Sequence, residues 1–451
     1  MVKLSESNRR TLETLLKEHA PLLGILLGFV LLSISLGPYS SWDAQLEFAA
    51  ASGVAKWGLP YTAFGDMINV PPLGYYIDVV FLQLFGFSYE TGIAVMTLFG
   101  LGCVFLVSRI GEVLYGKRTG LLAAALFALT PWQLIMSRVF LVDVQCLFFS
   151  LLYLLVGIRA IQKNSNKLFL LSGIIFGFAL LTKLFAVFML IPLALIYLYW
   201  GPKERNRILQ GMGLFFLSAL VLQFLWYNVI TGRGLFAIFK HDDFNMYLPS
   251  GFIPSPVFSL SFLTEILGVF FLFGFSFSLI ITFLERKLFA KIRVFDMIFL
   301  TAIIAIVGLN TYLAIGTNML NPYVNSIKYD YLTLPMFCWL AASLAKKSSI
   351  FLKRKRINDR HGKLLFYIAI AGLYLLLMSM IVNLMTINMM SKYEWLAFYA
   401  PGGLSYLFDV LPPILESSYN WAVQIFGFVL IQFSLLWAIK DKLASVLHAA
   451  Q

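Results

Sequence analysis

A long apolar run leads directly into an acidic segment in residues 21–61, PLLGILLGFVLLSISLGPYSSWDAQLEFAAASGVAKWGLPY. Residues 21–37 carry no charge and are long enough to cross a bilayer as a helix. Asp43 and Glu47 then follow four positions apart, a spacing that places them together on one face of a helix. The same segment has an apolar stripe at helical spacing, formed by Trp42, Leu46, Ala50, Val54 and Trp57. We therefore predict a membrane span followed by a helix that lies flat on the membrane and carries two carboxylates.

The composition of the whole chain agrees with a membrane protein. The 451 residues are 60% hydrophobic and 12% charged, which excludes an ordinary water-soluble globule. Apolar runs recur along the entire length, so we expect an all-α polytopic integral membrane protein with about 12 (11–13) transmembrane helices in a single membrane domain, residues 1–451. The predicted spans are 21–37, 91–113, 119–136, 144–160, 168–182, 184–200, 208–230, 261–284, 294–315, 329–345, 364–388 and 421–439.

The positions of the basic residues predict the topology. With the N-terminus in the cytoplasm, the Lys and Arg clusters fall in alternate loops, as in the segment KKSSIFLKRKRINDRHGK, and the C-terminus is cytoplasmic as well. The net charge of +12 is thus a topology signal, and we expect no nucleic-acid partner. The three cysteines, Cys103, Cys146 and Cys338, lie inside apolar segments and are expected to act as small core residues.

Residues 71–86, PPLGYYIDVVFLQLFG, form the ambiguous apolar run. The run is short and contains Asp78 and Gln83, and counting it as a span would reverse the charge pattern of every later loop. We therefore predict an amphipathic helix on the outer surface, within a first outer loop that covers residues 38–90. Two further long outer loops, residues 231–260 and 389–420, are aromatic and rich in Pro and Gly.

Several short motifs in the first half occur in a recognisable order: WDAQLEFAAASGVAKWGLPY, NVPPLGYYIDVV, LIMSRVFLVDVQ and FALLTKLF. In order and spacing they resemble the GT-C superfamily of membrane glycosyltransferases, in particular the protein O-mannosyltransferases and the lipid A aminoarabinose transferases. The resemblance covers residues 20–200, a GT-C-like catalytic module, and residues 201–451 would form variable C-terminal helices. A later segment, KYDYLTLP at 328–335, resembles the start of a late span in the same families. The resemblance falls on Asp43, Glu47, Pro71, Pro72, Leu73, Ser137, Arg138, Asp143, Leu181, Thr182 and Lys183.

This resemblance implies a glycosyltransferase that moves a sugar from a polyprenyl-phosphate donor to a glycan, lipid or protein acceptor at the outer or lumenal membrane face. Inverting displacement needs a base for the acceptor hydroxyl and cations for the departing phosphate. The implied catalytic residues are Asp43, Glu47 and Asp143, and the implied donor phosphate-binding residues are Arg138, Lys183 and Lys328. The substrate-shaping residues would be Pro71, Pro72, Tyr75, His241 and Asp242. Asp43, Glu47 and Asp143 could also hold a divalent cation, Mg²⁺ or Mn²⁺.

Some features leave alternatives open. Ala44 follows Asp43 where the families often have a second acid, and Val70 precedes Pro71 where they often have Lys, so an inactive relative is one alternative. A 12-helix secondary transporter is another. Glu47 could be a solvated surface residue, Arg138 and Asp143 could form a simple ion pair, and Lys183 could snorkel to the interface. The compartment would be the plasma membrane in a prokaryote and the endoplasmic reticulum in a eukaryote.

Overall fold

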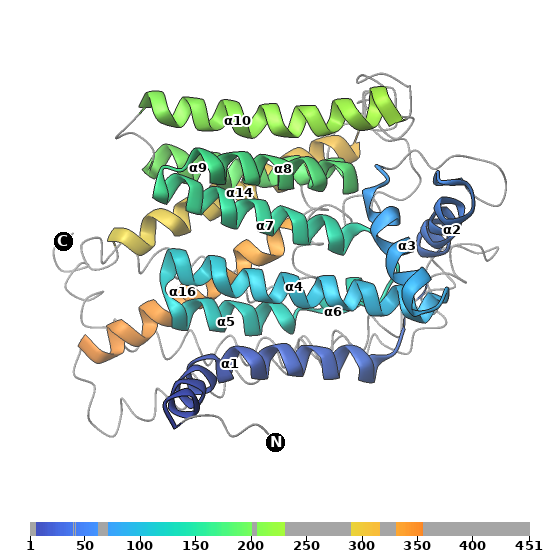
Figure 1. The fold of residues 1–451 in the computed structure, drawn as a ribbon. Coiled ribbons are helices and arrows are strands. Elements are labelled where there is room, and N and C mark those ends of the chain that lie inside the picture. The colour runs from blue at the N-terminus through green and yellow to red at the C-terminus, as the bar shows by residue number, and fades with distance from the viewer. Residues whose placement is uncertain are drawn as a thin grey trace. The chain divides into compact units, whose positions relative to one another are not determined.

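The computed structural model describes residues 6–38, 40, 42–61, 71–200, 205–230, 290–315 and 331–354 (Figure 1). The chain divides into two compact units. Unit 1 comprises Met1–Ala128, Gln133–Ser255 and Met297–Trp339, and unit 2 comprises Leu129–Trp132, Pro256–Asp296 and Leu340–Gln451. The predicted spans at 261–284, 364–388 and 421–439 and the predicted outer loops at 231–260 and 389–420 lie outside the described residues.

The described part of the chain is built from helices, as the apolar periodicity predicts. In chain order they are α1 (Glu6–Leu36), α2 (Trp42–Trp57), α3 (Leu73–Phe85), α4 (Tyr89–Tyr115), α5 (Lys117–Ala128), α6 (Pro131–Met136), α7 (Asp143–Lys163), α8 (Asn166–Thr182), the 3₁₀ helix η1 (Leu184–Met189), α9 (Leu190–Trp200), α10 (Arg205–Phe224), the π-helical turn η3 (Leu225–Ile230), α14 (Ala290–Ile315), the 3₁₀ turn η5 (Tyr331–Thr333) and α16 (Leu334–Arg354).

Among the described residues, four helices are long and apolar enough to cross a membrane. They are His19–Leu36, Tyr89–Tyr115, Asp143–Lys163 and Leu209–Ile230, and each contains one of the predicted spans or most of it. Shorter apolar helices cover Leu73–Phe85, Asn166–Thr182, Leu184–Trp200, Val294–Ile306 and Tyr331–Ser343. The predicted total of about 12 spans stays a prediction, since much of the second half lies outside the description.

The predicted span at 119–136 is wrong as a single helix. The structure has two helices there, because α5 ends at Ala128 and α6 begins at Pro131. A residue that precedes proline is disfavoured in the α conformation, so Thr130 is a natural end point for a helix. The break brings the chain into a buried turn at Ser137 and Arg138 before α7 begins.

Within unit 1, α7 packs against α4 and α8, and α8 also packs against α10 (Figure 1). The close approach of α8 and α10 depends on Gly173, since a Cβ at this position would lie 2.1 Å from the main-chain oxygen of Phe215. Aromatic rings fill the space beside it, with Phe176 stacked on Phe215 and Tyr153 edge-on to both. Small residues that let helix backbones meet are typical of membrane helix packing.

The outer face of α1 carries large exposed apolar side chains. Leu23, Leu27, Leu31 and Ile34 recur at helical spacing and are each more than half exposed. In water such a continuous apolar stripe would be unfavourable, whereas in lipid it is the expected surface of a spanning helix. The exposure pattern therefore agrees with the membrane location that the composition predicts.

α2 has the predicted bounds, but its buried face differs from the predicted apolar stripe. Ala44, Glu47, Ala50, Ala51 and Val54 are buried, whereas Trp57, at the end of the predicted stripe, is 57% exposed. The alternative in which Glu47 is a solvated surface residue is therefore wrong, since its side chain lies on the packed face. In Figure 1, α2 and α3 lie at one end of the bundle formed by α4, α7 and α8.

Unit 2 contains a buried polar cluster of its own. The Lys347 ammonium of α16 forms an ion pair with Asp296 of α14, and Ser343 donates a hydrogen bond to the same carboxylate at 3.2 Å. Asp296 and Lys347 are 2% and 1% exposed. An ion-paired carboxylate that is buried in this way is suited to a structural role in unit 2.

Candidate functional site

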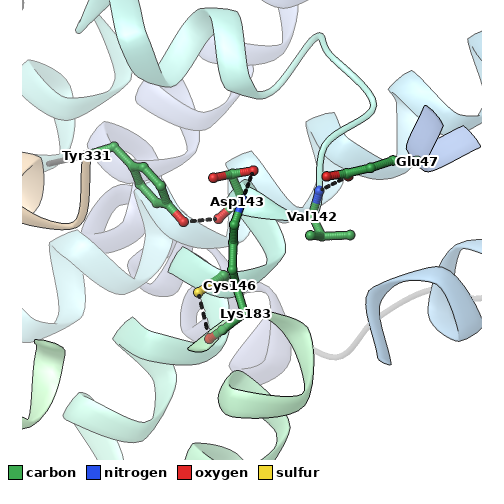
Figure 2. Close-up of polar contacts among 6 residues, drawn as sticks. All are labelled: Glu47, Val142, Asp143, Cys146, Lys183 and Tyr331. Atoms are coloured by element: carbon green, nitrogen blue, oxygen red, sulfur yellow. Dashed lines mark hydrogen bonds and ion pairs between the residues drawn. The ribbon is translucent and has the colours of Figure 1, made fainter. Parts of the chain in front are cut away.

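The N-terminal end of α7 is where charged side chains from separate elements of unit 1 meet. Residues 137–142 connect α6 to α7. All six are buried, whereas the residues of a connecting loop are usually exposed. Side chains from α2 and η5 and the residue between α8 and η1 all contact the first turn of α7 (Figure 2). We take this convergence as the candidate active site.

Glu47 joins α2 to this turn. One of its carboxylate oxygens accepts a hydrogen bond of 2.8 Å from the main-chain N–H of Val142, the residue before α7. The free N–H groups at a helix start favour a nearby negative charge, so the contact is electrostatically sound. Only 8% of Glu47 is exposed, and a carboxylate this buried requires partners to stay charged.

Asp143 and Lys183 form the central ion pair. The ammonium nitrogen of Lys183 lies 2.7 Å from one Asp143 carboxylate oxygen, and the side chains are 12% and 0% exposed. Burial alone would lower the pKa of Lys183, but the charges of Asp143 and Glu47 outweigh burial and raise this pKa above its usual value. Lys183 is thus held as a cation between two acids. The other oxygen of Asp143 is buried and makes no hydrogen bond with the described residues.

Two further groups pack against the pair. The Tyr331 hydroxyl donates a hydrogen bond of 3.0 Å to the main-chain oxygen of Asp143, which ties the late segment KYDYLTLP to α7 (Figure 2). The Cys146 thiol lies 3.8 Å from the main-chain oxygen of Lys183. The thiols of Cys103, Cys146 and Cys338 are all buried, as the sequence predicts.

Arg138 is buried and makes main-chain contacts. Its guanidinium donates hydrogen bonds to the carbonyl oxygens of Leu36 and Gly37 at 3.0 and 2.8 Å, at the end of α1, and another to Leu134. Cations at a helix C-terminus complement the exposed carbonyl groups there. Burial lowers the pKa of Arg138 to about 10, so the side chain remains charged at neutral pH.

A second acid, Asp78 of α3, lies fully buried behind Glu47. Its carboxylate accepts a hydrogen bond of 2.5 Å from the side-chain amide of Gln145, on the first turn of α7. Burial, and then the charge of Glu47, raise the pKa of Asp78 well above its usual value. From the sequence we placed Asp78 within an amphipathic helix on the outer surface and did not consider Gln145. A lone acid in an apolar run was the signal that could have identified this pair.

The other predicted site residues fall into two groups. Pro71, Pro72 and Tyr75 are buried at the start of α3, beside α7. Asp43 belongs to α2, but its side chain lies outside the described part of the chain, as do Lys328, His241 and Asp242 entirely. The structure therefore brings together Glu47, Asp143 and Lys183 and leaves the position of the Asp43 carboxylate open.

A metal site through Asp43, Glu47 and Asp143 has limited support from the donors that are described. Within the described residues no group of three or more His, Cys, Asp or Glu side chains is arranged to hold a metal ion. Glu47 binds a main-chain N–H through one carboxylate oxygen, and Asp143 binds Lys183 through one of its own. The other Asp143 oxygen makes no hydrogen bond with the described residues and could serve as a hard ligand. A cation would need Asp43 to complete the set.

Known proteins match the part of the chain that contains Asp143 and Lys183. Residues 69–230 match the family model of dolichyl-phosphate-mannose-protein mannosyltransferases. Two proteins of Bacillus subtilis (strain 168) that are named as candidate mannosyltransferases, YycA and YkcB, are 28% identical over 155 residues and 27% identical over 130 residues. These matches cover 34% and 29% of this chain, and the chain spans about a fifth of the length of each relative, 22% and 18%.

Solved structures share the fold. ArnT from Cupriavidus metallidurans in the apo state aligns with a TM-score of 0.51 and 18% identity, over 93% of this chain and 77% of that protein. The oligosaccharyltransferase AglB from Archaeoglobus fulgidus, in complex with an inhibitory peptide and a dolichol-phosphate, aligns with a TM-score of 0.51 and 15% identity, over 87% and 59%. The chain thus shares the fold of ArnT and AglB, and its residues 69–230 match the mannosyltransferase family model.

Proposed function

We propose that the chain is a glycosyltransferase that transfers a sugar from a polyprenyl-phosphate donor to an acceptor hydroxyl at the outer or lumenal face of the membrane. The observation that carries this proposal is the meeting of Glu47, Asp143 and Lys183 at the start of α7. Asp143 and Lys183 belong to the region that matches the mannosyltransferase model, and Glu47 reaches it from the preceding helix α2. The structural relative AglB, which is described with a dolichol-phosphate and a peptide, supports a lipid-linked donor.

The proposed reaction is a direct displacement. The acceptor oxygen attacks the anomeric carbon while the bond from this carbon to the phosphate oxygen breaks, and polyprenyl phosphate leaves with the bonding electrons. The acceptor proton passes to a carboxylate of the first outer loop. A cation near the leaving phosphate stabilises its growing charge, and the buried Lys183 ammonium is suited to this task in a site that excludes water.

Asp43 is the proposed base, with Glu47 as the second acid of the same helix. In related enzymes the two acids are often adjacent, whereas here Ala44 occupies the next position. Ala44 and Glu47 both lie on the buried face of α2, three positions apart, so Glu47 can present a carboxylate where an acid at 44 would point. This geometry supports an active enzyme rather than an inactive relative.

The remaining features of the proposal rest on the resemblance. The donor phosphate would be held by Arg138, Lys183 and Lys328, and the acceptor would be a glycan, a lipid or a protein. Mg²⁺ or Mn²⁺ would bind only if Asp43 joins Asp143 as a ligand. Both termini would face the cytoplasm, in a plasma membrane or an endoplasmic reticulum membrane.

The test uses the purified full-length protein in detergent. It is incubated with radiolabelled polyprenyl-phosphate sugars, and release of polyprenyl phosphate is measured for the wild type and for Asp43→Asn. We expect release in the wild type and its loss in Asp43→Asn, because the change removes the base and little volume. Glu90→Gln is the matched control, an exposed acid at the start of α4 that should retain full turnover. If no donor gives release from intact wild-type protein, the proposal is wrong and a transporter becomes the better hypothesis.

A further inference from the structure

The Asp78–Gln145 pair is a buried polar contact to which the proposed mechanism gives no role. Asp78 and Gln145 are each 0% exposed, and each retains one oxygen without a hydrogen bond in the described structure. The amide of Gln145 also lies 3.9 Å from the sulfur of Met96 on α4. Burying polar atoms without hydrogen bonds costs free energy, so a pair that keeps two such atoms among apolar helices calls for an explanation.

The pair lies directly behind the candidate site. Gln145 is two residues after Asp143 and three after Val142, so it belongs to the turn of α7 that carries the contacts to Glu47 and Lys183. Glu47 acts electrostatically on Asp78 as well as bonding to Val142. Any rotation of the first turn of α7 would therefore move the Asp143 carboxylate. It would also move the main-chain N–H of Val142, which donates a hydrogen bond to Glu47.

α3 is held against this turn by a very close contact. A Cβ at Gly74 would lie 2.5 Å from a methyl carbon of Val142 and 2.6 Å from the side-chain oxygen of Gln145. Gly74 thus allows the helix that bears Asp78 to touch the two residues that flank Asp143. The segment PPLGYYID contains both residues of this contact. Gly74 allows α3 to lie close to α7, and Asp78, one helical turn later, accepts the hydrogen bond from Gln145.

We propose that Asp78 is a positioning residue, which fixes the first turn of α7 through Gln145 and so sets the relative placement of Asp143, Lys183 and Glu47. This inference rests on the proposed transferase function, and it assigns no contact with substrate to Asp78. Its action is indirect, through the amide of Gln145.

The charges around Asp78 favour the protonated acid for this task. Among the described charged groups, Glu47 on α2 raises the pKa of Asp78. The neighbouring side chains from α7 and α4, Gln145 and Met96, are neutral. Lys183, which follows α8, is paired with Asp143. A protonated acid keeps its acceptor oxygen for the amide and adds no third negative charge beside Glu47 and Asp143.

The experiment compares Asp78→Asn, Asp78→Ala and Gln145→Ala in the donor-release assay, with Gln83→Ala on the exposed face of α3 as the matched control. Asp78→Asn keeps the shape and neutrality of the acid, so we expect kcat within about twofold of wild type. Asp78→Ala and Gln145→Ala should lower kcat by on the order of tenfold to a hundredfold, with the donor KM nearly unchanged, because misplaced groups slow the chemical step.

The outcomes distinguish positioning from other roles. Wild-type kcat in Asp78→Ala would overturn the proposal, and so would an Asp78→Asn variant as inactive as Asp78→Ala, since a carboxylate charge would then be required. If the wild type releases no polyprenyl phosphate at all, the proposed function fails independently. In that case the Asp78–Gln145 contact is tested by stability alone, by comparing the Tm values of Asp78→Ala, Gln145→Ala and the double variant with that of the wild type. Additive losses would overturn the pairing, and a double-variant loss no larger than either single loss would support it.

Discussion

The Glu47 carboxylate accepts a hydrogen bond from the main-chain N–H of Val142, a residue 95 positions later in the chain. This bond fastens the first outer-loop helix to the start of α7 and places one acid beside another, Asp143. It also accounts for the burial of Glu47 on a helix that was predicted to lie flat on the membrane. The bond is therefore the first contact to test.

Glu47→Ala should destabilise the protein, because it leaves the buried N–H of Val142 without a partner, at a cost of about 1–3 kcal/mol. Glu47→Gln can still accept this bond, so its Tm should stay close to wild type. Its turnover should fall less than that of Asp43→Asn, since Asp43 is the proposed base. Thermal unfolding in detergent and the donor-release assay measure the two effects, and a Tm of Glu47→Ala equal to wild type would contradict the contact.

Removing one member of the Asp143–Lys183 pair should cost about 3–5 kcal/mol, because the remaining charge is left buried and unpaired. The double variant Asp143→Asn with Lys183→Met should recover part of this stability without recovering turnover. Tm and turnover of the two single variants and the double variant form the measurement. A double variant with normal turnover would exclude both residues from the reaction.

The substitution Arg138→Lys distinguishes two roles of Arg138, which are holding the end of α1 and binding the donor phosphate. One ammonium cannot reproduce the guanidinium contacts to Leu36, Gly37 and Leu134, so bracing predicts a lower Tm with an unchanged donor KM. Phosphate binding predicts the reverse, a raised donor KM with little loss of Tm. We expect a lower Tm from the lost carbonyl contacts together with a raised donor KM, because the proposal also assigns Arg138 to the donor phosphate. An unchanged donor KM, measured on the same preparation, would restrict Arg138 to bracing.

The raised pKa of Asp78 predicts a pH-dependent stability. The native state holds a proton on Asp78 at pH values where the unfolded chain, with the usual Asp pKa of 3.8, has lost it. The free energy of unfolding therefore decreases as pH rises above about 4 and continues to decrease until the native pKa is reached. Asp78→Asn should lack this contribution, so its Tm relative to wild type should increase between pH 5 and pH 8. A constant difference over this range would show that Asp78 does not bind a proton on folding.

The local structure was largely predictable because hydropathy and helix periodicity are local properties. The bounds of α2 and α3 follow from Trp42–Trp57 and from the run after Pro72. The span predicted at 119–136, which falls within the described part of the chain, failed as one helix at a single proline. The site was less predictable, since its contacts join residues far apart in the chain. No spacing rule pairs Glu47 with Val142, or Tyr331 with Asp143 across 188 positions.

The sequence also did not show which polar side chains are buried. Arg138 and Lys183 were expected to face a phosphate, and the structure supplies protein partners for both of them. Asp78 was expected in a helix on the outer surface, and it is fully buried instead. A single acid in an apolar run gives no sign of the side to which it points. Only the packing of α3 on α7 decides that side, and it depends on the tertiary fold.

Tyr331 and Trp339 define how much chain a minimal fragment that retains the candidate site must contain. Tyr331 bonds to the main-chain oxygen of Asp143, and the Trp339 indole donates a hydrogen bond of 2.9 Å to the main-chain oxygen of Val107 while its ring packs on Phe299. A fragment that stopped at residue 230 would lack two large buried rings and leave cavities where they pack against the N-terminal part of the chain. Expression boundaries, and the search for a natural two-part version of this protein, should therefore be set after Trp339.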